Sequence, residues 1–465
     1  EADTLLLAGE MSISGGMDKE TSLAWVICRD RLFVWNYFSP IASRNGVVLD
    51  LPSSTFETRD SSRNAFNSNT WLVCILNWDC LNRNSDKLIS QCNSAGIIVC
   101  NRRSRTLVYW PEIYSESRSA PVLSSASVEE LEVLLWPGDG KANYNKQQQR
   151  TKQGSSITGL SSLNSLIATP VLGANHVCVS LACSSNGDLW QFFCSPFAIE
   201  WKKIFQDMLG TASSGGDGSH LVGSKGYPRS LTWLLFNSFS ETKRQFLLLT
   251  DREIQCFCVK LTPDYNVSKL WSHEIVGTDG DLGIQKDLAG QKRIWPLDLQ
   301  IDNDGKVITI LIAIFCKDRI TSSSYTEYSL LTMQYRSGLS ISTENVKPTS
   351  ERVLEKKAPI QVIIPKARVE DEEFLFSMRL KIGGKPAGSV IILSGDGTAT
   401  VSHYWRNSTR LYQFDLPYDA GKVFDAAVFP SLDDGEDGAW AVLTEKAGFW
   451  AIPERAILIG GVEPP

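Results

Sequence analysis

Short apolar runs along this chain come in pairs, and each pair is joined by a few polar or glycine-containing residues. The first pair covers residues 23–28 and 32–35 around the turn Arg29-Asp30-Arg31, and the second covers residues 96–100 and 106–110. Five more pairs follow at 177–193, 246–259, 307–335, 390–405 and 439–452. β-branched and aromatic residues suit a pleated, buried surface, and short turns fix the register of a hairpin. The pattern therefore predicts seven β-hairpins.

The seven hairpins are distributed over the whole chain, and long helical patterns are almost absent. Seven hairpins in 465 residues give one repeat per about 66 residues, longer than the roughly 40–50 residues of compact propeller repeats. The excess lies in stretches rich in Ser, Gly, Asn or charge, which are typical of surface loops. An all-β, seven-bladed β-propeller with long inter-blade loops explains this organisation, because radial repetition protects strand edges. Two β-sandwich domains are the alternative, but no linker interrupts the repeat.

Composition and charge narrow the function. Hydrophobic residues make up 43% and charged residues 21% of the chain, which is typical of a globular protein. The net charge of −6 gives no positive field for nucleic acid, so we expect no direct nucleic-acid partner. The one basic cluster, Arg102, Arg103 and Arg105, is interpreted as an exposed turn. No apolar run approaches the roughly 20 residues of a membrane-spanning helix.

Cysteine and histidine usage argues against metal and redox chemistry. The eleven cysteines include no C-x-x-C pair, and most lie inside apolar runs, which indicates packed thiols in a reducing compartment. The four histidines show no metal-binding spacing. Asp302-Asn303-Asp304-Gly305 resembles a calcium loop but lacks the required ligands at both ends, so a hairpin turn is expected. The sequence predicts no catalytic residue, no cofactor and no metal.

One segment has the spacing of an amphipathic helix. Trp201, Ile204, Phe205, Met208 and Leu209 fall at i, i+3, i+4, i+7 and i+8, with charged residues on the opposite face. Such a helix could contact a membrane surface or a partner protein. The alternative is that its apolar face packs on the flank of the propeller.

A second segment, at 155–167, has a similar apolar stripe with a different polar face. Ile157, Leu160, Leu163, Leu166 and Ile167 are opposed by Ser, Thr and Gly. A small, uncharged polar face binds lipid through apolar insertion into packing defects, which makes binding sensitive to curvature. The alternative is an inter-blade loop that happens to contain leucines.

Three runs together carry a resemblance to a known family: residues 32–37 (LFVWNY), 107–111 (LVYWP) and 442–450 (VLTEKAGFW). With these runs the chain resembles the N-terminal β-propeller family of nucleoporin 133. Its composition, rich in Ser and Cys, is typical of a plant version. The resemblance implies a non-enzymatic scaffold in the outer ring of the nuclear pore complex, at the nuclear envelope, with other nucleoporins as partners and a role in mRNA export and protein transport. It also implies a possible curvature-sensing segment between blades three and four.

The resemblance further predicts the domain organisation. We expect residues 1–460 to form one propeller domain and residues 461–465 to begin a linker to an α-helical region. Two other functions stay open from the residues alone: an interaction propeller of a coat or adaptor complex, and a propeller hydrolase. A hydrolase would need carboxylates or histidines that converge near the central channel.

Overall fold

The structure is a computed structural model of the 465-residue chain. It describes the following ranges: 13–38, 46–52, 71–79, 92, 94–102, 105–114, 121–125, 163–184, 188–204, 228–234, 242–263, 267–277, 280–283, 292–302, 305–317, 324–336, 353–357, 361–363, 372–404, 411–415, 421–429 and 438–459.

The described residues form seven antiparallel sheets, in each of which the strands follow chain order. Blade 1 consists of β1 (Ile13–Asp18), β2 (Leu23–Cys28), β3 (Arg31–Asn36) and β4 (Val47–Asp50). Blade 2 consists of β5 (Trp71–Asn77), β6 (Ala95–Asn101), β7 (Thr106–Trp110) and β8 (Val122–Ser125). Blade 3 consists of β9 (Leu163–Pro170), β10 (Cys178–Ser184), β11 (Leu189–Cys194) and β12 (Ile199–Ile204). Blade 4 consists of β13 (Pro228–Trp233), β14 (Lys243–Thr250), β15 (Glu253–Lys260) and β16 (Val267–Glu274).

In the second half of the chain the described residues form three more blades and two short helices. Blade 5 consists of β17 (Lys292–Ile301), β18 (Val307–Lys317), β19 (Ser324–Tyr335), β20 (Leu354–Lys356) and β21 (Gln361–Ile363), the last two both pairing with β19. Blade 6 consists of β22 (Arg379–Gly384), β23 (Ser389–Leu393), β24 (Ala399–Tyr404) and β25 (Leu411–Asp415). Blade 7 consists of β26 (Val423–Val428), β27 (Trp440–Thr444) and β28 (Gly448–Ile452). The helices are α3 (Glu372–Phe376) and α4 (Glu454–Ile459).

The seven hairpins predicted from the sequence are confirmed. Each one forms the second and third strands of one blade, from β2–β3 in blade 1 to β27–β28 in blade 7. The segment at Asp302 is also a hairpin turn, as expected, because it connects β17 with β18 and the carboxylate of Asp302 accepts the N–H groups of Lys306 and Val307. The described part of the chain holds no helix with the length and apolar character needed to span a bilayer.

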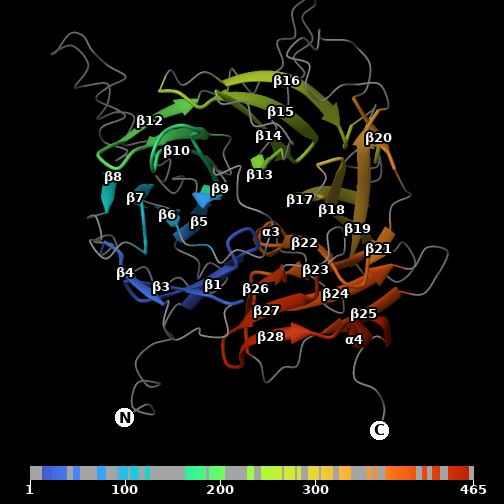
Figure 1. Cartoon of the computed structure of the whole chain (residues 1–465). Helices are drawn as coiled ribbons and strands as arrows, with labels where there is room; N and C mark the ends of the chain where they lie inside the picture. Colours follow the sequence, from blue (N-terminus) through green and yellow to red (C-terminus); the bar gives the residue numbers. More distant parts are fainter. Residues whose placement is uncertain are drawn as a thin grey trace, which may run out of the picture.

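The blades form a closed ring (Figure 1). Six core clusters fill the interfaces between blades that follow one another in the chain. A seventh cluster joins Met17 and Ala24 of blade 1 to Ala427, Ala441 and Leu443 of blade 7. Because every sheet buries both faces against neighbours, the seven sheets share one continuous core rather than forming two sandwiches.

The first strand of each blade lies innermost and lines the centre of the ring. β1 packs beside β26, and β13, β17 and β22 follow one another in the same way. Bonds join corresponding ends of these strands, for example Asn164 near the start of β9 with Pro228 at the start of β13. The first strands therefore run in the same direction. We call the side where they begin the start face and the opposite side the finish face.

Candidate functional site

The first predicted contact segment is a β-strand where the structure describes it, so the helix expected at Trp201 and Ile204 is wrong there. Both residues belong to β12, which pairs with β11 in register. Trp201 packs between blades 2 and 3, with its ring 5.5 Å from that of Trp190, whereas Ile204 is buried between blades 3 and 4. Positions three apart lie on one side of a helix but on opposite sides of a strand, so the two-sided burial explains the misleading apolar spacing.

The second predicted segment also ends in a strand. Leu163, Leu166 and Ile167 belong to β9, the innermost strand of blade 3, and not to an amphipathic helix. Leu163 and Leu166 pack toward blade 2, and Ile167 packs toward blade 4. A register shift at the start of β9 inserts an extra residue, Asn164. The bulge disturbs the two-residue alternation, and this is why the strand resembled a helix in the sequence.

The other five predicted contact residues lie outside the described residues. Ile157 and Leu160 precede β9, and Phe205, Met208 and Leu209 follow β12. They belong to the segments 126–162 and 205–227, which connect blade 2 to blade 3 and blade 3 to blade 4. Their contact with a membrane or partner stays a prediction.

The two described arginines of the basic turn, Arg102 and Arg105, are not exposed as expected, and Arg103 lies outside the described residues. Arg105 is 6% exposed, has a positive φ of 58°, and stacks its guanidinium 4.7 Å from the ring centre of Trp190 in blade 3. The Nη1 of Arg102 donates to the carbonyl of Leu163 at 3.0 Å, and the N–H of Leu163 donates back to the carbonyl of Arg102. The turn thus ties blade 2 to blade 3 on the start face.

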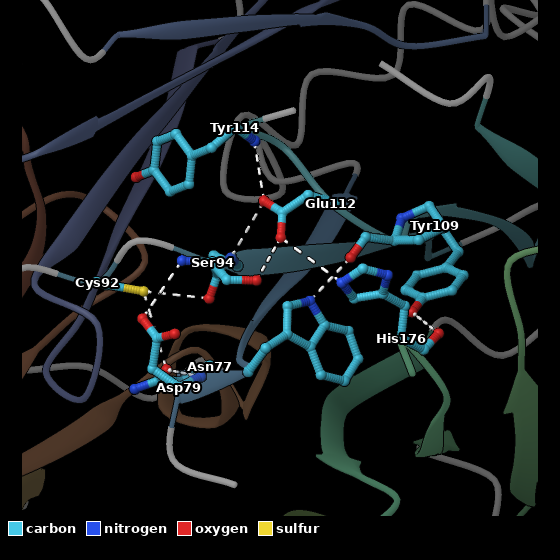
Figure 2. A network of polar contacts seen from close by, with 11 residues as sticks. Asn77, Asp79, Cys92, Ser94, Tyr109, Glu112, Tyr114 and His176 are labelled. Carbon is cyan, nitrogen blue, oxygen red and sulfur yellow. Dashed lines mark hydrogen bonds and ion pairs between the residues drawn. The ribbon is translucent and has the colours of Figure 1, made fainter. Parts of the chain in front are cut away.

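A polar network on the finish face connects the same two blades (Figure 2). Its centre is Glu112, which follows β7. One carboxylate oxygen of Glu112 accepts the N–H of Tyr114 at 2.9 Å, and the other accepts the hydroxyl of Ser94 and lies 3.7 Å from Nε2 of His176. The hydroxyl of Tyr109 donates to the carbonyl of His176 at 2.5 Å. The network therefore holds the loop before β10 against blade 2.

The arrangement does not support nucleophilic catalysis. In a catalytic triad the histidine lies between the hydroxyl and the carboxylate, because it must take the hydroxyl proton. Here the carboxylate of Glu112 lies between Ser94 and His176. Burial raises the pKa of the neighbouring Cys92 thiol to about 12, so that thiol stays protonated. No group of three or more His, Cys, Asp or Glu side chains in the described ranges could hold a metal ion.

Two buried aspartates tie innermost strands of neighbouring blades together. Asp425 of blade 7 accepts the N–H of Met17 in blade 1 at 2.9 Å, and Asp298 of blade 5 accepts the N–H of Leu380 in blade 6 at 2.8 Å. The second oxygen of each carboxylate accepts the N–H of the following residue at 2.8 Å. Each aspartate directly follows a β-bulge in its strand. The bulge turns the side chain toward the next blade, which forms an aspartate clamp at each of these two interfaces.

The two clamps differ in charge environment. Burial raises the pKa of Asp298. Burial also acts to raise the pKa of Asp425, but Lys381, Arg379 and the two backbone N–H groups outweigh it, and the pKa is lowered overall. Lys381 Nζ lies 3.1 Å from Asp425 Oδ1. Asp425 therefore forms an ion pair with Lys381 of blade 6, while it also accepts the N–H of Met17 in blade 1.

Sequence reasoning missed Glu112, Asp298 and Asp425. A usable signal existed for the clamps, because each aspartate stands alone among apolar residues inside a strand, in Pro-Leu-Asp-Leu and Val-Phe-Asp-Ala. An acid in such a run must be paired when the strand is buried. Its partner belongs to another blade, however, and the sequence does not show which.

A family model described as Nup133 N terminal like matches residues 7–451. The chain belongs to this family. It is 49% identical over 458 residues to the nuclear pore complex protein NUP133 of Arabidopsis thaliana, and the match covers 98% of this chain. The same match covers 33% of the relative, so the chain spans about a third of the length of that curated protein.

The fold has a counterpart among solved structures. The crystal structure of the Nup133 β-propeller domain of Vanderwaltozyma polyspora superposes with a TM-score of 0.51 at 12% identity, over 94% of this chain and 93% of the other. At that identity the likeness concerns the fold alone. It agrees with the seven-bladed ring of the Nup133 N-terminal family described above.

Proposed function

We propose that this chain is a non-enzymatic scaffold propeller of the nuclear pore complex, located at the nuclear envelope and bound to other nucleoporins. The match to the Nup133 N-terminal family carries this proposal, together with a nuclear pore relative that is 49% identical. From this position the chain supports nucleocytoplasmic transport, including mRNA export and protein transport.

The geometry supports a binding role rather than a catalytic one. The closed ring presents broad faces and a rim for protein contact. The described polar clusters hold blades together: Glu112 joins blades 2 and 3 through His176, and the aspartate clamps join blades 5 and 6 and close the ring. The carboxylates of Asp298 and Asp425 are buried and accept backbone N–H groups of two neighbouring blades, which is a structural role.

Proximity labelling tests the scaffold role. The full chain is fused to a promiscuous biotin ligase and expressed in plant cells, with the ligase alone as the control. We expect labelling at the nuclear rim and enrichment of nucleoporins over the control. Enrichment of vesicle-coat or ubiquitin-ligase subunits without nucleoporins would instead support the adaptor propeller and contradict our proposal.

We also propose that the chain contacts curved nuclear-envelope membrane through the segments 126–162 and 205–227. The apolar residues Ile157, Leu160, Phe205, Met208 and Leu209 of these segments support the proposal. Flotation of the full chain with vesicles of graded radius tests it, with Phe205→Glu and Leu160→Glu as variants. We expect stronger flotation with smaller vesicles and its loss in at least one variant. Flotation that is absent at every radius would refute membrane contact.

A further inference from the structure

Six of the seven interfaces between neighbouring blades hold an aromatic ring at their finish-face end. Each of these aromatic residues stands within one residue of the finish-face end of a strand, and each belongs to the core of its interface or packs against it. In ring order, with the blade 5–6 interface left out, they are Trp110, Trp78, Trp233, Tyr335, Trp440 and Phe429. A large apolar side chain therefore closes each of these six interfaces at the finish face.

The indole N–H groups at these ends have oxygen acceptors. Nε1 of Trp78 donates to the carbonyl of Pro111 at 2.8 Å, and Nε1 of Trp440 donates to Oγ of Ser389 at 2.7 Å. A buried indole needs such a partner, because an unpaired N–H away from water costs free energy. A tryptophan at the finish-face end of an interface thus combines a filled apolar space with one hydrogen bond.

The interface between blades 5 and 6 differs at its finish-face end. The described aromatic residues of its core, among them Trp295 of β17 and Tyr328 of β19, lie in the half nearer the start face. The finish-face end holds a pocket of about 240 Å³ instead. Two threonines, three aliphatic residues, one serine and two glycines line it, and none of these described lining residues is aromatic.

Small residues on both blades leave this space open. Thr309 of β18 and Thr332 of β19 lie directly opposite each other on the blade 5 side of the pocket. On the blade 6 side, a β-bulge in β22 accommodates Gly383 with a φ of 90°, and Gly388 before β23 has a φ of 87°. Such backbone angles favour glycine, which adds no side chain to fill the gap. The pocket is therefore a consequence of the residues at this one interface.

The pocket is accessible and has the size of an indole ring. Leu330 and Val390 in its lining are buried, whereas Gly388 is exposed, so the pocket has an apolar interior and an open rim. A cavity of about 150 Å³ holds benzene, and scaling by non-hydrogen atoms gives about 225 Å³ for indole. The hydroxyl oxygens of Thr309 and Thr332 can accept the indole N–H.

We propose that this pocket between blades 5 and 6 binds a tryptophan side chain carried by an extended segment of a partner protein. The partner's ring takes the position that an aromatic residue of this chain occupies at the other six interfaces. Tryptophan is enriched among the residues that dominate binding energy, because it fills a desolvated pocket with a large rigid ring. The site follows from the fold and from the chemistry of its lining, and it does not depend on which protein supplies the tryptophan.

Fluorine NMR with the full chain tests the proposal. The probe is N-acetyl-5-fluorotryptophan amide, and the unlabelled competitors are N-acetyltryptophan amide and N-acetylleucine amide. We expect the probe resonance to shift and broaden saturably as protein is added, and the tryptophan amide to reverse the effect. The leucine amide should need a concentration about tenfold higher or more, because its smaller side chain makes fewer contacts in the pocket.

Variants locate the binding. Thr332→Phe places a ring in the pocket from blade 5 and is expected to weaken probe binding about tenfold or more, because little space remains. Thr309→Phe is a second, independent filling variant from the paired strand. Thr398→Phe is the matched control, because Thr398 is exposed in the turn between β23 and β24 and does not line the pocket. We expect the control to bind like the wild type, and thermal unfolding establishes that each variant is folded.

The outcomes separate the alternatives. Absence of saturable binding up to the solubility limit of the probe would overturn the proposal, and a tryptophan of this chain outside the described residues, such as Trp136, would give that result by filling the pocket itself. Equal competition by the leucine amide would mean an aliphatic occupant and would overturn the assignment of tryptophan. Unchanged binding in a folded Thr332→Phe variant would place the probe elsewhere.

Photolabelling of the wild type gives a localisation that needs no variant. A diazirine analogue of N-acetyltryptophan amide is photolysed with the full chain, and the labelled residues are mapped by mass spectrometry. We expect label in residues 382–390 that the unlabelled tryptophan amide suppresses. Label confined to other parts of the chain would contradict the proposed site.

Discussion

The interface between blades 7 and 1 closes the ring, and we predict that Asp425→Ala destabilises the protein there. The core of this interface holds five buried residues, three of which are alanines (Ala24, Ala427, Ala441). Six partly buried residues pack against this core and add apolar contact: Val26, Trp35, Tyr37, Phe424, Phe429 and Phe449. The aspartate clamp supplies a polar contact at this interface, and the ion pair of Asp425 with Lys381 connects blade 7 to blade 6.

The magnitude follows from the groups that the substitution leaves unpaired. The backbone N–H groups of Met17 and Ala426 lose their acceptor, and each unsatisfied buried donor costs about 1–3 kcal/mol. Lys381 also loses its partner, but its side chain is 25% exposed and can be partly hydrated. We expect the free energy of unfolding to fall by about 4 kcal/mol. With an unfolding entropy of about 2.1 cal/mol/K per residue, the midpoint falls by about 4 °C if the ring unfolds as one unit.

Urea and thermal unfolding of wild type and variant, followed by circular dichroism, measure this loss. Asp50→Ala is the matched control, because Asp50 forms an ion pair with Arg31 at 3.6 Å while its side chain is 88% exposed. We expect the control to change stability by less than about 0.5 kcal/mol. Asp298→Ala removes the same pair of backbone bonds at the blade 5–6 interface and should also destabilise. The reasoning is refuted if Asp425→Ala unfolds like the wild type, or if the exposed control costs as much.

Two further predictions concern the buried carboxyl group of Asp18 and strand β12, whose sequence predicted a helix. Burial, followed by the charge of Glu20, raises the pKa of Asp18 to about 6. Between pH 4 and 6 the folded state therefore binds more protons than the unfolded state, so the free energy of unfolding falls as pH rises. Asp18→Asn should remove about 2 kcal/mol of that decline, measured by urea unfolding at pH 4.5 and 7, and an unchanged pH profile would contradict it. Ile204→Ala should cost about 2–5 kcal/mol because Ile204 is buried between blades 3 and 4, whereas Lys202→Ala on the same strand should cost little; equal effects in thermal unfolding would argue against β12.

The sequence by itself determined the class of fold and the number of repeats. Each blade contains one hairpin whose two strands are close in the chain and buried on both faces, so their apolar runs and turn residues are visible without tertiary information. The hairpin at 439–452 is an example, because Trp440 pairs with Ile452 across a short turn. The count of seven follows from such local signals, and so does the family resemblance.

The tertiary structure decided the rest, because the remaining contacts join residues far apart in the chain. The first and fourth strands of a blade bury their two faces against different neighbours, so β12 and the bulged β9 have an apolar spacing that a helix would also show. Asp425 accepts a hydrogen bond from Met17, 408 positions away, and that pairing exists only because the ring closes. Arg105 of blade 2 likewise stacks on Trp190 of blade 3, a contact that the sequence, which showed only a basic turn, does not reveal.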